Sequence, residues 1–109
     1  METMLANSEV NMPFCVNVRA KIHGDKDYLE AFDFNKEWEV YDFSVTDAEA
    51  NEAVLRADTL VQVDAESKEK AIEIAMATYP PLGIKEPLAP CNVEIWVDSD
   101  IDVTEKNLV

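Results

Sequence analysis

Alternation of apolar and polar residues predicts the most regular strand of this chain, near its N-terminus. The even positions of residues 13–22, PFCVNVRAKI, are Phe14, Val16, Val18, Ala20 and Ile22. The odd positions include Cys15, Asn17, Arg19 and Lys21. A period of two is typical of a β-strand with one buried face. We therefore predict a strand here and a turn at residues 23–27, HGDKD.

Residues 28–45, YLEAFDFNKEWEVYDFSV, predict a hairpin of two aromatic-rich runs joined around Asn35 and Lys36. The second run changes its parity, because Trp38 and Val40 share one face whereas Tyr41 and the apolar residues after it fall on the other. This change indicates either a β-bulge near Val40 and Tyr41 or burial on both faces of the strand.

Residues 46–58, TDAEANEAVLRAD, fit two interpretations. Thr46 and Glu49 have the spacing of a capping box, and alanines with one valine form a helical stripe, which favours a helix. In the alternative, residues 47–51 form a loop and residues 54–63 form a strand that pairs with the run before it. We expect the helix and keep the strand as the alternative.

The next segment predicts a strand, a helix and a crossover. Thr59, Val61 and Val63 share one face of a short strand, and Ser67 is the expected N-cap of the following helix. That helix is expected to bury Ala71, Ile72, Ala75 and Tyr79 and to stop before Pro80. Residues 80–90, PPLGIKEPLAP, form the crossover loop, and a last strand begins near Asn92.

These elements predict an α+β fold: a small mixed β-sheet of four to five strands with one or two helices packed on one face. The last strand is expected to run parallel to the strand at residues 59–63. A chain of 109 residues suits one domain, which we assign to residues 13–103. Residues 1–12 are expected to be a flexible N-terminal segment and residues 104–109 a C-terminal tail.

The last predicted strand, VEIWVDSDIDV at residues 93–103, separates acids from aliphatic residues by parity. Glu94, Asp98, Asp100 and Asp102 share even positions with Trp96. If the segment is one strand, these carboxylates repeat at intervals of about 6.8 Å on one face. Such a row resembles a nucleic-acid backbone as a basic groove meets it. The alternative is an edge strand whose charges prevent aggregation.

The overall charge points to the same class of partner. The chain has 23 Asp and Glu residues against 9 Lys and Arg residues, a net charge of −14. This charge disfavours direct binding to nucleic acid and to anionic membranes, and it attracts basic protein surfaces. The alternative is that the acidity only serves solubility. No signal sequence or apolar membrane span is visible, so we expect a cytoplasmic protein.

Catalytic and metal motifs are absent from the sequence. His23 is the only histidine, the chain has two glycines, and no serine lies in a G-x-S-x-G motif. Residues 98–102 match the start of a calcium loop, but Val103 replaces its glycine and Val109 its glutamate. We therefore expect a non-enzymatic protein without cofactor or metal. Cys15 and Cys91 are either reduced thiols or a disulfide.

The expected function is binding to a basic surface of a nucleic-acid-handling protein. In size and charge alone, the chain resembles acidic DNA or RNA mimics of the phage anti-restriction and anti-CRISPR type. The alternative is a small accessory subunit or adaptor that meets its partner through apolar surface. The candidate partner-binding residues are Glu94, Trp96, Asp98, Asp100, Asp102, Glu37, Glu39 and Asp42.

Overall fold

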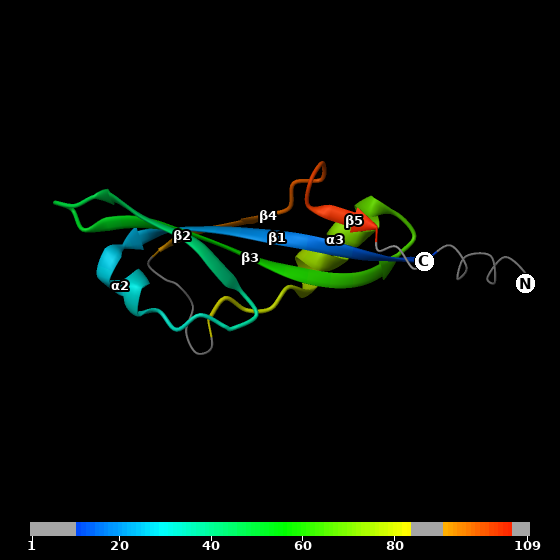
Figure 1. The fold of residues 1–109 in the computed structure, drawn as a ribbon, viewed down its shortest axis with the longest axis horizontal. Helices are drawn as coiled ribbons and strands as arrows, with labels where there is room; N and C mark the ends of the chain where they lie inside the picture. Colours follow the sequence, from blue (N-terminus) through cyan, green and yellow to red (C-terminus); the bar gives the residue numbers. More distant parts are fainter. Residues whose placement is uncertain (1–10, 84–90, 106–109) are drawn as a thin grey trace, which may run out of the picture. The chain divides into compact units, whose positions relative to one another are not determined.

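The computed structural model describes residues 11–83 and 91–105 and confirms the α+β class. In chain order the elements are β1 (Met12–Asp25), α2 (Lys26–Ala31), β2 (Glu39–Asp47), β3 (Glu52–Ala65), α3 (Lys68–Thr78), β4 (Asn92–Trp96) and β5 (Val103–Glu105) (Figure 1). The strands form one sheet in the order β2-β3-β1-β4, and β5 also pairs with β1.

The sheet is antiparallel, so the expected parallel pairing of the last strand is wrong. β4 pairs with β1, with Ala20 opposite Ile95, and not with the strand that contains residues 59–63. In the strand order β1 separates β4 from β3, so β4 extends the sheet from β1. On its other side β3 pairs with β2 over Glu52–Asp58.

The chain divides into two compact units, and β1 and β3 contribute residues to both. We call residues 19–59 and 80–96 the hairpin unit, because it contains β2 and its pairing with β3. We call residues 1–18, 60–79 and 97–109 the terminal unit.

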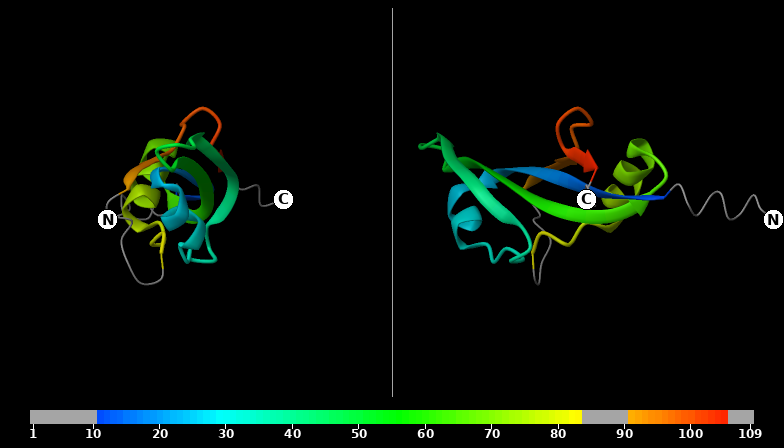
Figure 2. Two further views of the ribbon diagram at one scale, coloured as in Figure 1. Left: turned by 90° about the vertical axis from the view of Figure 1, so that its left-hand side faces the viewer. Right: turned by 45° about the vertical axis from the view of Figure 1, so that its right-hand side comes forward.

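The hairpin unit has a small apolar core under its strands. Its buried residues are Ala20, Ile22, Leu29, Trp38, Ala53, Leu55 and Ala57. Trp38 is held in place by its indole nitrogen Nε1, which donates a hydrogen bond to the Pro80 carbonyl at 2.9 Å. Figures 1 and 2 show α2 next to the β2–β3 hairpin in each view.

The predicted hairpin over residues 28–45 is wrong in its first half, where residues 28–31 belong to α2 and residues 32–36 form no strand of the sheet. Asp25 starts this helix because its side chain accepts a hydrogen bond from the Tyr28 backbone N–H. Lys26 and Glu30 then form an i,i+4 ion pair of 3.6 Å along the helix. The hairpin is instead made by β2 and β3.

The expected helix over residues 46–57 is also wrong, and the alternative of a loop followed by a strand is correct. Asp47 Oδ1 accepts a hydrogen bond from the Ala50 N–H, which closes the turn before β3. A helix over this segment would bury mainly small alanine side chains. In the observed strand, Ala53, Leu55 and Ala57 all point into the core, so Leu55 is buried as well.

Of the two interpretations of the parity change, the bulge near Val40 and Tyr41 is correct, and burial on both faces is not. Val40 lies opposite Ala57 and Asp42 opposite Arg56, so Tyr41 is an extra residue in β2. A second register shift separates Val45 from Asp47. The bulge explains the parity change, because it keeps Val40 on the apolar face of β2 although the spacing of apolar residues changes.

The terminal unit follows the sequence prediction more closely. Ser67 is the N-cap of α3, and its hydroxyl accepts a hydrogen bond from the Lys70 N–H at 3.1 Å. Ala71 and Ala75 are buried, whereas Ile72 and Tyr79 are only half-buried. β5 pairs with the first half of β1, and α3 contacts β5 (Figure 2).

Some expectations fall on residues that the structure does not describe. These are most of the N-terminal segment (residues 1–10), residues 84–90 of the crossover loop and residues 106–109 of the tail. Within the described ranges, neither helix has the length and apolar character needed to cross a membrane.

Candidate functional site

The predicted row of carboxylates does not lie on one strand. β4 ends at Trp96, residues 97–102 form a turn, and β5 begins at Val103. Glu94 and Trp96 therefore belong to a strand of the hairpin unit, whereas Asp98, Asp100 and Asp102 belong to a turn of the terminal unit. Short polar residues such as Asp and Ser hydrogen-bond their own backbone, so they favour a turn here over a continuous strand.

The turn at residues 98–102 is closed by its own carboxylates. Asp102 Oδ2 accepts a hydrogen bond from the Asp98 N–H at 2.8 Å, and Asp98 Oδ1 accepts one from the Asp100 N–H at 3.0 Å. Asp102 Oδ1 lies 3.4 Å from Asn17 Nδ2, which donates to it. Asp102 is only 4% exposed, so its carboxylate is not available as a partner contact in the way that the predicted row requires.

Glu94 and Trp96 face the most basic stretch of the chain. In the pairing of β1 with β4, Glu94 lies opposite Lys21 and Trp96 opposite Arg19. Opposite charges in cross-strand positions stabilise a sheet modestly. The acidic side chain of β4 is thus set against a basic one and is not part of a purely acidic face.

A shallow pocket of about 520 Å³ lies on this side of the hairpin unit. Its lining residues are Lys21, His23, Thr46, Asp47, Glu52, Val54, Asn92 and Glu94. His23 Nε2 lies 3.7 Å from Glu52 Oε1, and both side chains are about half exposed. The lining of this pocket combines three carboxylates with one lysine and one histidine.

The predicted residues Glu37, Glu39 and Asp42 lie together on β2 and the turn before it, and all three are exposed. Asp42 is 3.9 Å from Arg56 Nε on the neighbouring strand, which is a loose ion pair. Glu37 also has a structural role, because its backbone carbonyl accepts a hydrogen bond from Thr59 Oγ1 at 2.7 Å.

The β2–β3 ladder places like charges opposite one another at both ends. Glu39 lies opposite Asp58, and Asp47 lies opposite Glu52. Carboxylates in cross-strand positions repel each other and destabilise the ladder. Three of these residues, Asp47, Glu52 and Asp58, were missed from the sequence because their segment was assigned to a helix. The unbroken alternation of buried residues from Ala53 onward is the signal that could have placed them on a strand.

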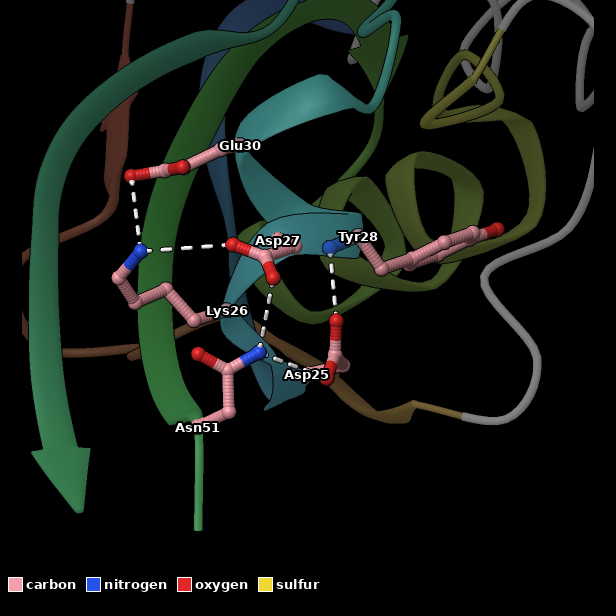
Figure 3. A network of polar contacts seen from close by, with 6 residues as sticks. All are labelled: Asp25, Lys26, Asp27, Tyr28, Glu30 and Asn51. Carbon is pink, nitrogen blue, oxygen red and sulfur yellow. Dashed lines mark hydrogen bonds and ion pairs between the residues drawn. The ribbon is translucent and has the colours of Figure 1, made fainter. Parts of the chain in front are cut away.

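Asn51 joins the hairpin turn to the start of α2 (Figure 3). Its backbone has a φ of 58°, a left-handed conformation that Asn tolerates better than most residues. Its side-chain nitrogen Nδ2 donates hydrogen bonds to Asp25 Oδ1 at 3.0 Å and Asp27 Oδ2 at 3.1 Å. Its carbonyl accepts a hydrogen bond from the Lys26 N–H at 2.8 Å.

The same network lowers the pKa of Asp25 below its ordinary value of 3.8. The main cause is the hydrogen bond that its carboxylate accepts from the Tyr28 backbone N–H, and the next is the bond from the Asn51 amide. Both bonds stabilise the ionised form. The carboxylate of Asp25 is thus engaged within the fold.

The two cysteines are free thiols. Burial raises the pKa of the Cys91 thiol, which disfavours the reactive thiolate form. Gly24 accommodates this side chain, because a Cβ atom at Gly24 would collide with Cys91 Sγ. Across residues 11–83 and 91–105, no group of three or more His, Cys, Asp or Glu side chains is arranged to hold a metal ion.

Comparison with known proteins adds no relative: no family model, curated protein or solved structure matches this chain. Its function is therefore inferred from the charges and geometry of its own residues.

Replacing Asp102 with Asn should destabilise the protein, whereas replacing Asp100 with Asn should not. An amide offers one acceptor oxygen in place of two, so one of the two N–H donors around residue 102 loses its partner. We expect Asp102→Asn to lower the free energy of unfolding by about 1–3 kcal/mol. Asp100→Asn, at an exposed position, should change it by less than about 0.5 kcal/mol. Urea denaturation of both variants measures this, and equal effects would contradict the assigned role of Asp102.

Replacing Asn51 with Gly should raise the pKa of Asp25 while leaving it below its ordinary value. Glycine keeps the left-handed backbone but removes the amide donor, and the Tyr28 N–H bond remains. Because the folded pKa is depressed, the stability from Asp25 is present above its unfolded pKa and is lost as the pH falls through the folded value. In the variant the stability from Asp25 should be smaller, and its loss should be complete at a higher pH, because the folded pKa lies closer to the unfolded one. Carboxyl NMR titration measures the shift, with Ala48→Gly in the same turn as the control that should leave it unchanged.

Proposed function

We propose that this protein is a non-enzymatic acidic binder of a basic surface on a nucleic-acid-handling protein, acting as a mimic of the nucleic-acid backbone. The contact surface is the exposed acidic side of the hairpin unit, centred on Glu37, Glu39 and Asp42. This surface replaces the C-terminal row of aspartates as the leading candidate, because Asp98 and Asp102 bond within their own turn.

Net charge alone does not distinguish the two units. Among described residues, the hairpin unit carries twelve Asp and Glu against five Lys and Arg, a difference of seven negative charges. The described part of the terminal unit carries eight against two, a difference of six. The acidity is therefore general, and the arrangement of the carboxylates distinguishes the hairpin.

The observation that carries the proposal is the pairing of Glu39 with Asp58 across the ladder. Neither carboxylate forms an ion pair with any residue in the described part of the chain. Such a pair costs stability in the free protein. A lysine or arginine of a partner that enters between the two carboxylates relieves this repulsion, so the arrangement favours a cationic partner.

A second candidate function is supported by apolar residues on the same strand. Val40, Tyr41 and Val45 are 40%, 51% and 46% exposed. These side chains suit an adaptor that binds its partner through apolar contacts. The negative charge of the chain would then serve only to keep the protein soluble. The two functions differ in salt dependence, because charge-driven association weakens as ionic strength rises, whereas apolar association does not.

The replacement Glu39→Gln should stabilise the protein and weaken partner binding at the same time. Removal of one carboxylate relieves the repulsion from Asp58, for a gain of about 0.2–1 kcal/mol in the free energy of unfolding. Binding should weaken because a contact charge is lost. Affinity capture from a nuclease-treated bacterial lysate, with melting temperature measured on the same preparations, tests both effects.

The matched control is Glu66→Gln, which removes one exposed charge from the terminal unit and should leave capture unchanged. Captured proteins should elute with moderate salt and be displaced by duplex DNA. Proteins that stay bound in high salt and are not displaced by DNA would contradict the mimic and favour the adaptor.

A further inference from the structure

β2 is the outermost strand of the sheet order β2-β3-β1-β4. Within the described residues, its only strand partner is β3, which pairs with one of its two edges. Figures 1 and 2 show this strand running beside β3. The backbone N–H and C=O groups of the other edge are a template on which an extended segment can add as a further strand.

The two faces of β2 differ in chemistry. Val40, Phe43 and Val45 lie opposite Ala57, Leu55 and Ala53, so they share the apolar face of the sheet. Glu39 and Asp42 lie opposite Asp58 and Arg56, and they share the polar face. A strand added beside β2 therefore has apolar neighbours on one face and acidic neighbours on the other.

A second copy of this chain is a poor occupant of the edge. In an antiparallel pair of β2 strands centred on Phe43, Glu39 of one copy meets Asp47 of the other at both ends. Each such pair places like charges opposite one another, which destabilises the pairing. The same carboxylates attract lysine and arginine, so charge complementarity selects a basic segment.

We infer that the free edge of β2 binds, by strand addition, an extended segment of the partner in which apolar residues alternate with lysine or arginine. This inference rests on the proposed function and specifies how the basic partner is recognised. The added strand pairs with residues 42–45, the regular stretch between the two register shifts. Its apolar residues lie beside Phe43 and Val45, and its cations lie beside Asp42.

Two synthetic peptides of about ten residues and identical composition test the inference. One alternates valine or threonine with lysine, and the other carries the lysines in one block. We expect the alternating peptide to bind at least about tenfold more tightly by calorimetry. It should also slow amide hydrogen exchange in residues 42–45.

The variant Val45→Lys supplies the structural control. Val45 is 46% exposed, so the fold should tolerate lysine there, but a cation on the apolar face should reduce binding of the alternating peptide by about tenfold. Leu60→Lys changes a residue that is 66% exposed in the terminal unit, and it should leave binding unchanged.

The outcomes separate this inference from the proposed function. Equal, salt-sensitive binding of both peptides would overturn strand addition at β2 while leaving a charge-driven function intact. Failure of both peptides to bind at low salt would overturn both. Self-association through β2, seen as a dimer in sedimentation that Val45→Lys abolishes, would overturn the choice of a basic segment as the occupant.

Discussion

The register of the β2–β3 ladder fixes the arrangement of charge in the hairpin unit. The apolar residues of β2 lie opposite the buried residues Ala53, Leu55 and Ala57, and a shift of one residue would turn every apolar side chain to the other face. On β3 these residues are buried, whereas on β2 only Phe43 is partly buried, so the register is set mainly by the buried face of β3. As a consequence, Glu39 must lie opposite Asp58, although the two carboxylates repel each other. In the proposed complex, a basic group of the partner offsets this repulsion.

The two acidic regions of the chain differ in what their carboxylates do. At residues 98–102, Asp98 and Asp102 accept hydrogen bonds from backbone N–H groups and hold the turn in shape. Their charge is part of the local structure. On the hairpin, Glu39 and Asp58 have no such bonds to described residues, so their charge is available to a partner. The contrast explains why the hairpin, and not the aspartate-rich turn, is the stronger candidate surface.

Much of the fold could be predicted from periodicity, because burial on one face leaves a clear pattern. This holds for β1, for the Ser67 cap of α3 and for the bulge at Tyr41. The errors arose where one pattern fits two structures. Small alanines at residues 50–57 fit a helix and a strand equally well. After Trp96, Asp still alternates with Ile and Val as in a strand, although residues 97–102 form a turn. Burial of Asp102 depends on its bond to Asn17, a contact over 85 positions that no local pattern contains.

Exposed carboxylates on this fold, such as Glu39 and Asp58, lie without neutralising partners among the described residues, so the stability of the protein should depend on salt. Mobile ions screen repulsion between exposed charges over a distance of about 10 Å at 0.1 M salt. The melting temperature, followed by circular dichroism, should therefore rise between low and moderate NaCl concentrations, and it should rise less in Glu39→Gln than in the unchanged protein. A melting temperature that stays constant or falls over this range would contradict the account, because it would show that the acids are already paired within the protein.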